Sequence, residues 1–208
     1  MDADKENADT ARARGERLIP TAEFDALLRE QAQRLAGEFQ KERQKQFPPR
    51  LSLILDRPPE AGIRKVAVLM LADLPDGEEK RRKLFLVGAD AALNGLFPVA
   101  AFLCTESWIK NLSPAEGWRA KNKPLPVPSQ CPDRTEGLVV SGSTLDGRMN
   151  MAIADIQRYG RGMTLGPWKF HDFANAKTGV AVESDLLKYF FAGHYLGQMT
   201  RDEKKGEA

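Results

Sequence analysis

The sequence predicts an α+β fold, in which three helices pack on a mainly antiparallel sheet of about five or six strands. The clearest observation is a β-hairpin over residues 135–156, in which Asp146-Gly147 provides the turn. Val139 and Val140 precede this turn, and apolar residues recur at every second position after it. The later strands also lie close together in the sequence and are joined by turns. Strands connected in this way pair antiparallel.

The length and composition fit one folded domain. The chain has 208 residues, of which 42% are hydrophobic, enough for a sizeable core. Lys and Arg number 31 against 29 for Asp and Glu, a balance that argues against a nucleic-acid-binding protein. We expect a disordered tail over 1–18, a single α+β domain over 19–199 that includes a Pro-rich loop over 111–132, and a charged tail over 200–208.

The cysteines and the apolar runs predict a cytoplasmic protein. Cys104 lies in an apolar run and Cys131 in the Pro-rich loop, and we interpret both as reduced thiols. The first residues are polar and lack the apolar segment of a signal peptide. The best membrane candidate, residues 96–104, is far shorter than the roughly 20 residues that a spanning helix needs.

The first part of the chain reads as a helix followed by two strands. An amphipathic helix begins near Thr21, which can cap it, and runs to about Gln46, before Pro48. Residues 51–55 and 65–71 are apolar runs that we expect to form a hairpin.

A second helix and a long strand follow. Residues 76–79 form a capping-box pattern that starts the helix, and residues 94–95 (Asn-Gly) end it. Residues 96–108 read as extended, and a period of two places Glu106 and Trp108 on the same face of this strand.

The remaining elements flank the hairpin. The prolines of 111–132 predict a long irregular loop, which in a compact domain is either functional or disordered. Residues 163–170 form one more strand, and Pro167 indicates that it lies at a sheet edge or bends there. A final amphipathic helix starts near residue 182, and the chain is charged from Thr200.

No pattern in the sequence predicts a metal or a cofactor. There are two histidines, His171 at a strand end and His194 at the expected end of the last helix, and no Cys-x-x-Cys pair. The glycine patterns of phosphate-binding loops are also missing. Ser141 lies within a strand rather than at a strand-to-helix turn, so it is a poor nucleophile candidate. We expect neither cofactor nor metal.

Glu106 is the most informative ionisable residue. It shares its predicted face with Cys104 and Trp108, so we expect it to be partly buried. A buried carboxylate needs a cation or a hydrogen-bond donor, or it takes up a proton. Arg134 or Arg148 could supply the cation. Such a pair could line a pocket, or it could be a structural ion pair.

Three motifs together resemble a known pattern: the segment 104–110, Pro-Asp-Arg-Thr-Glu at 132–136, and Leu-Asp-Gly-Arg at 145–148. They resemble a loosely defined group of uncharacterised bacterial, archaeal and phage proteins. In that group a strand ending in Glu-Ala-Trp precedes a variable loop, then Pro-(Asp/Glu)-Arg-x-Glu and a hairpin with Asp-Gly-Arg at its tip. Here Ser107 replaces the Ala, and the likeness covers residues 65–158.

The resemblance attaches no activity to the chain. It implies that five residues gather around one end of the sheet: Glu106, Trp108, Asp133, Arg134 and Glu136.

The function that we predict from these observations is a non-catalytic binding or accessory module of a bacterial or phage system. Its protein partner would contact the loop 111–132 and the adjacent sheet end, including Trp108, Asp133, Arg134 and Glu136.

Two alternatives remain open. The first is a small hydrolase-like enzyme in which Glu106 acts as general acid or base and Arg134 stabilises developing negative charge. The second is weak nucleic-acid binding through basic helix faces such as residues 80–83.

Overall fold

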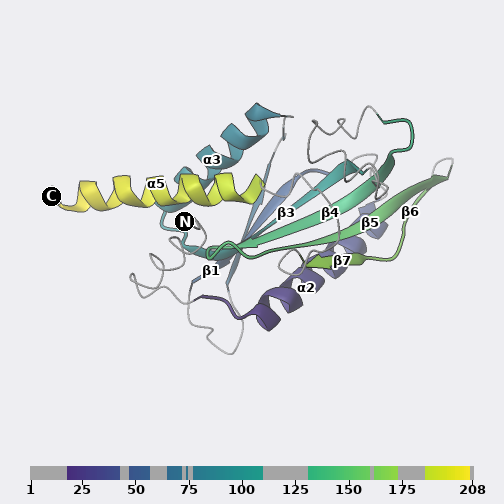
Figure 1. The fold of residues 1–208 in the computed structure, drawn as a ribbon, viewed down its shortest axis with the longest axis horizontal. Coiled ribbons are helices and arrows are strands. Elements are labelled where there is room, and N and C mark those ends of the chain that lie inside the picture. Colours follow the sequence, from purple (N-terminus) through teal and green to yellow (C-terminus); the bar gives the residue numbers. More distant parts are fainter. Residues whose placement is uncertain are drawn as a thin grey trace, which may run out of the picture.

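A seven-stranded antiparallel sheet forms the middle layer of the molecule, and helices cover both of its faces (Figure 1). This computed structural model describes residues 18–42, 47–56, 65–71, 74, 77–109, 131–159, 162–172 and 186–206. The arrangement confirms the predicted α+β class, with a slightly larger sheet than expected.

The described elements follow the predicted order closely. They are α2 (Thr21–Glu42), β1 (Arg50–Leu55), β2 (Val66–Met70), α3 (Glu78–Leu93), β3 (Pro98–Ile109), β4 (Thr135–Thr144), β5 (Met149–Tyr159), β6 (Gly162–Leu165), β7 (Lys169–Asp172) and α5 (Leu186–Gly206). The strands lie in the order β2-β1-β3-β4-β5-β6, and β7 pairs with another stretch of β5. Each neighbouring pair is antiparallel.

The helix α2 packs on one face of the sheet. Its apolar residues recur every three or four positions, so they form one stripe that is buried against the strands. The rings of Phe24 and Phe102 stack with their centroids 5.4 Å apart. Gly142 of β4 makes room for this pair, because a Cβ there would come within 2.7 Å of the Phe102 ring.

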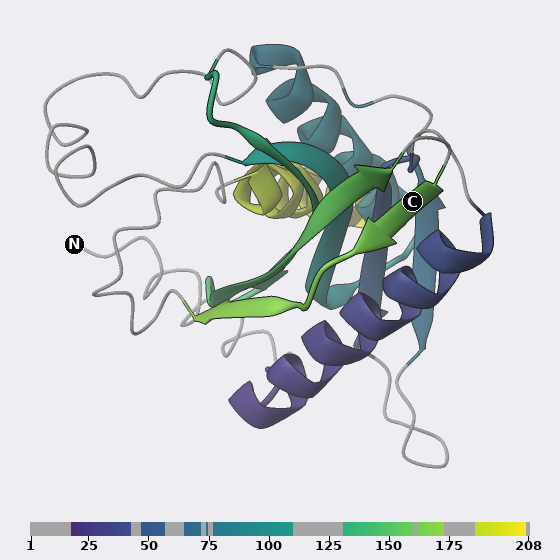
Figure 2. The ribbon, with the colours of Figure 1, turned by 90° about the vertical axis from the view of Figure 1, so that its right-hand side faces the viewer.

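The helices α3 and α5 pack together on the opposite face, as Figures 1 and 2 show from two directions. Glycines allow a very close approach of their backbones. A Cβ at Gly193 would lie 1.9 Å from the carbonyl oxygen of Phe85, and one at Gly88 would lie 2.0 Å from that of Phe190. Any larger side chain at the crossing would therefore push the helices apart.

The predicted hairpin is present between β4 and β5. Gly147 has φ +86°, a conformation that favours glycine, and its N–H donates to the carbonyl of Thr144. The hydroxyl of Thr144 accepts a hydrogen bond from the N–H of Arg148 at 3.0 Å and donates one to Asp146 at 2.5 Å. The turn is therefore held by its own side chains.

Two elements differ in their boundaries from the sequence-based expectations. The strand expected over 163–170 is divided into β6 and β7, and the exposed Pro167 lies between them, which confirms the expected bend. The helix α5 continues to Gly206, so residues 200–206 are helical rather than a frayed tail. The N-terminal tail and most of the Pro-rich loop lie outside the described residues.

The helix crossing gives a first prediction. Gly193→Ala is expected to lower the free energy of unfolding by at least about 2 kcal/mol, because the new methyl group would clash with the backbone at Phe85. Gly37→Ala is the matched control, since no atom lies within 4 Å of its Cβ position, and it should stabilise α2 by about 0.5–1 kcal/mol. Urea unfolding measures both changes. Equal stability of wild type and Gly193→Ala would contradict the described crossing.

Candidate functional site

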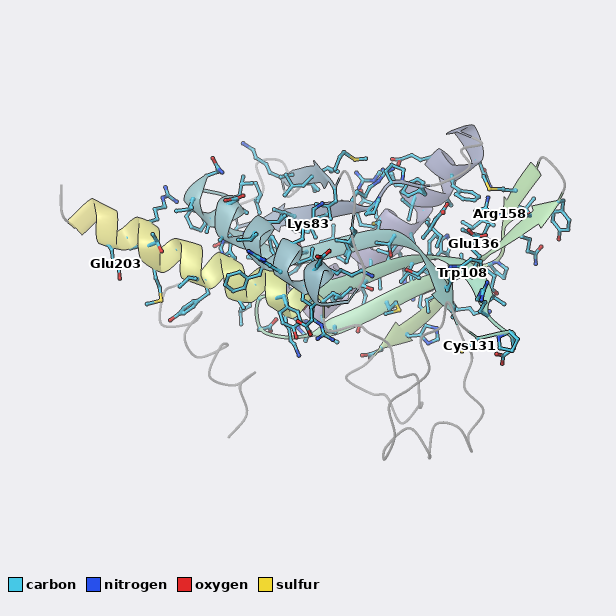
Figure 3. All side chains as sticks on the ribbon, turned by 90° about the horizontal axis from the view of Figure 1, so that it is seen from above. Lys83, Trp108, Cys131, Glu136, Arg158 and Glu203 are labelled. Atoms are coloured by element: carbon cyan, nitrogen blue, oxygen red, sulfur yellow. The ribbon has the colours of Figure 1, made fainter. Side chains whose placement is uncertain are left out.

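One end of the sheet carries a group of charged and aromatic side chains. The first seven residues of β3, from Pro98 to Cys104, are buried, whereas the next five are partly or largely exposed. In this outer part, Trp108 lies directly opposite Glu136 of β4, and Glu106 lies opposite Leu138. Figure 3 shows Trp108 and Glu136 at the same end as Arg158 of β5, far from the C-terminal end of α5.

The key side chains lie on the face that α2 covers. Side chains alternate along a strand, so Glu106 and Trp108 follow the buried Cys104 on that face. On β5, Arg158 follows the buried Ile156 in the same way. The shared face of Glu106 and Trp108 was predicted from the sequence.

An arginine bridges two glutamates at the centre of this group. The guanidinium of Arg158 donates to both carboxylate oxygens of Glu136, at 2.6 Å from Nε and 2.5 Å from Nη2. Its Nη2 also lies 3.9 Å from Oε2 of Glu106. The other oxygen of Glu106 accepts a hydrogen bond from the N–H of Phe47 at 2.9 Å. Both carboxylates are thus engaged by donors.

Burial dominates the electrostatics of Glu106, whose side chain is only 13% exposed. Burial raises the pKa of the Glu106 carboxyl above its usual value, because the charged form loses hydration. The Phe47 N–H acts in the opposite direction, the negative charge of Glu136 raises the pKa further, and the positive charge of Arg158 lowers it. The protonated form of Glu106 is therefore favoured relative to a free carboxyl.

A second pair of side chains lies beside these charges. The guanidinium carbon of Arg134 is 4.6 Å from the ring centroid of Trp108, a cation–π contact. The backbone N–H of Arg134 donates to the carbonyl of Cys131 at 3.4 Å, and its Nη1 lies 3.5 Å from the same oxygen. Trp108 remains 45% exposed. An indole and a guanidinium are thus presented together at the surface.

The structure places each predicted site residue. Glu106, Trp108, Arg134 and Glu136 gather at this sheet end, and Asp133 lies in the exposed turn just before β4.

The cation beside Glu106 is Arg158, whereas we expected Arg134 or Arg148. Arg148 lies at the other end of the hairpin, where it donates to the hydroxyl of Thr21 at 2.5 Å and to the carbonyl of Ile19. Sequence reasoning missed Arg158, although the alternation after Ile156 places it on the correct face.

A buried polar network under α2 adjoins the site. Arg50 of β1 forms an ion pair with Glu38 of α2, and its guanidinium lies 4.3 Å from the ring centroid of Phe47. Phe47 therefore contacts both Arg50 and Glu106. Cys104 lies opposite Arg50 in the sheet, and burial raises the pKa of its thiol to about 12. A neutral thiol at neutral pH is a core residue rather than a nucleophile.

His194 differs from the expectation. It lies in the middle of α5 rather than at its end, and it is 2% exposed. A ring nitrogen, Nε2, forms a 2.7 Å hydrogen bond with the carbonyl of Leu96, and burial lowers the pKa of the imidazole. A small hollow adjoins this histidine, and its lining residues are Asp56, Phe97, Pro98, Val99, Leu145, His194 and Gln198.

The described residues hold no group of three His, Cys, Asp or Glu side chains with the geometry of a metal site. Within the same part of the chain, every helix is too short or too polar to span a membrane. No family model, curated protein or solved structure matches this chain.

The buried carboxyl gives a pH-dependent prediction. Because the folded-state pKa of Glu106 lies above its ordinary value of 4.5, the unfolded state releases this proton at a lower pH. Wild type should therefore lose stability relative to Glu106→Gln as the pH rises through the unfolded-state pKa and then the folded-state pKa of Glu106. Urea unfolding from about pH 3.5 to about pH 7.5 measures the difference. A relative gain of the wild type with rising pH would contradict the dominance of burial.

The buried thiol gives a further prediction. In a Cys131→Ser variant, Cys104 is the remaining cysteine and should react with Ellman's reagent only when the protein unfolds. At a fixed pH, the rate should then rise with the denaturant concentration, because it follows the fraction of unfolded protein. Complete modification within minutes under native conditions would show that Cys104 is accessible.

Proposed function

We propose that this protein is a non-catalytic binding module of a bacterial or phage system that holds a protein partner at the outer end of its sheet. We name the described part of the contact surface the Trp108 platform and define it as Trp108, Arg134, Glu136 and Arg158. The observation that carries the proposal is the half-exposed indole of Trp108 beside the guanidinium of Arg134.

Tryptophan and arginine are the residue types that most often dominate the energy of protein interfaces. Both present a large flat surface together with hydrogen-bond donors. The cation–π contact restrains Trp108 and Arg134 before a partner arrives, so less side-chain entropy is lost on binding. This supports recognition of a protein surface.

The charged residues of the platform are also held in place. The two hydrogen bonds between Arg158 and Glu136 fix both side chains beside Trp108. A polar border around an aromatic centre is the usual arrangement of an interface that forms and dissociates. The Pro-rich loop 111–132 is part of the proposed contact surface, and its residues before Cys131 lie outside the described structure.

One observation favours the alternative of a small hydrolase-like enzyme that uses Glu106 with Arg134. Burial raises the pKa of Glu106, as a general acid requires. Against this alternative, both oxygens of Glu106 face donors of the protein itself, and Arg134 lies on the indole ring. We therefore place binding first and catalysis second.

We also propose a cytoplasmic location. Cys104 and Cys131 are both buried and neither forms a disulfide, which agrees with a reducing compartment. The resemblance to the prokaryotic and phage group belongs to the same proposal.

The proposal predicts which substitutions abolish binding. Trp108→Ala and Arg134→Ala should each weaken recovery of the partner from the native host at least about 10-fold, while the circular dichroism spectrum stays unchanged. Tyr159→Ala is the matched control, because Tyr159 is 63% exposed and follows Arg158 on the opposite face of β5. Quantitative affinity capture with purified variants measures the effect. Equal loss with all three variants, or a specific turnover by the purified wild type, would overturn the proposal.

A further inference from the structure

The strand β2 forms one edge of the sheet and consists entirely of apolar residues, Val-Ala-Val-Leu-Met. Ala67 and Leu69 pack against the core under α3 and α5. The other three side chains point to the opposite face and are 41% (Val66), 43% (Val68) and 57% (Met70) exposed. An edge strand thus carries a row of exposed apolar residues.

Two backbone hydrogen bonds, one at each end of β2, fix the direction in which its N–H and C=O groups point. The N–H of Leu55 donates to the carbonyl of Lys65 at 3.0 Å, and the N–H of Leu71 donates to that of Pro49 at 2.9 Å. In an antiparallel pair, every second residue directs both its N–H and its C=O toward the neighbouring strand. The backbone N–H and C=O groups therefore face β1 at residues 65, 67, 69 and 71, and they point outward at residues 66, 68 and 70.

The outward groups have no strand beside them in the described part of the chain, where β1 is the partner of β2. The helix α2 packs over β3, β4 and β5 and leaves this row uncovered. Edge strands of natural proteins are usually protected from pairing by a central lysine, a proline or a bulge. The strand from Val66 to Met70 has none of these, and its pairing with β1 is regular.

We propose that β2 is a dimerisation strand, which pairs antiparallel with β2 of a second copy of this chain around a two-fold axis at Val68. In this register, Val68 lies opposite Val68 of the other copy, and Val66 lies opposite Met70. The two sheets become one continuous sheet, with both copies of α2 on the same face.

The strand itself selects a second copy and this register. A two-fold antiparallel pair is self-complementary, so one apolar sequence satisfies both sides of the interface. Backbone hydrogen bonds form only where outward-facing residues meet, and the axis at Val68 uses all three such residues of each copy. Every facing pair is apolar, and the exposed Lys65 of each copy lies at opposite ends of the interface. No like charges meet across it.

The size of the interface sets the expected affinity. One five-residue strand per copy buries less surface than a standard stable interface. The dimer should therefore be reversible, and it should form at protein concentrations on the order of micromolar. The Trp108 platform lies at the outer end of β3, β4 and β5, and β1 separates these strands from β2. The platform therefore stays accessible in the dimer.

Sedimentation velocity across a concentration series tests the proposal. Wild type should shift from monomer to dimer, whereas Val68→Lys and Val68→Pro should remain monomeric. Proline is chosen because the N–H of Val68 points away from β1, so its loss should spare the fold. Leu86→Lys is the matched control, since Leu86 is 52% exposed on α3, and it should dimerise as the wild type does. A wild type that stays monomeric at several hundred micromolar, or equal loss with Leu86→Lys, would overturn the proposal.

Cross-linking tests the register. Facing residues of an antiparallel pair have Cα atoms about 5.5 Å apart, within the range of a disulfide. Val68→Cys should therefore form an intermolecular disulfide under mild oxidation, while the native cysteines are buried. Val66→Cys should not link to itself, because the two copies of residue 66 lie roughly 13 Å apart along the strands, but it should link to Met70→Cys. Equal self-linking of Val66→Cys and Val68→Cys would overturn the register.

Discussion

The pairing register between β3 and β4 is the constraint on which the rest of this structure depends. The inner half of β3 is buried on both faces, with Phe102 under α2 and Leu103 toward α3 and α5. A slip of one residue would exchange these two faces, so both cores together hold the strand in place. The outer half of β3 continues in the same register with β4, which places Trp108 opposite Glu136. Gly137 secures it by leaving room for the side chain of Ile109.

The outer half shows how a surface site can be stable without a core of its own. Arg158 joins Glu136 to Glu106, and the N–H of Phe47 completes the set of donors around Glu106. These bonds connect three strands and the segment before β1. They offset the cost of partly burying the Glu106 carboxylate, and Trp108 is left at the surface. The charged side chains of Glu106, Glu136 and Arg158 thus hold this sheet end together around the exposed indole of Trp108.

Local patterns in the sequence were sufficient for much of the fold. Alternation predicted the hairpin around Gly147 and the shared face of Glu106 and Trp108, because both follow from neighbouring residues. The partner of Glu106 was missed because Arg158 reaches it across β4, and that contact depends on two registers at once. The central position of His194 was missed because the charged residues after Thr200 were interpreted as a tail, whereas α5 continues through them to Gly206.

Backbone proton distances across β3 and β4, measured by nuclear Overhauser effects, test the central claim most directly. The account predicts cross-strand effects that connect Trp108 with Glu136 and Glu106 with Leu138. Effects between like backbone protons (Hα with Hα, or amide with amide) that instead pair Trp108 with Gly137 would mean a shift of one residue. Such a shift would move Trp108 away from the face shared with Arg158, and it would contradict the site described for this protein.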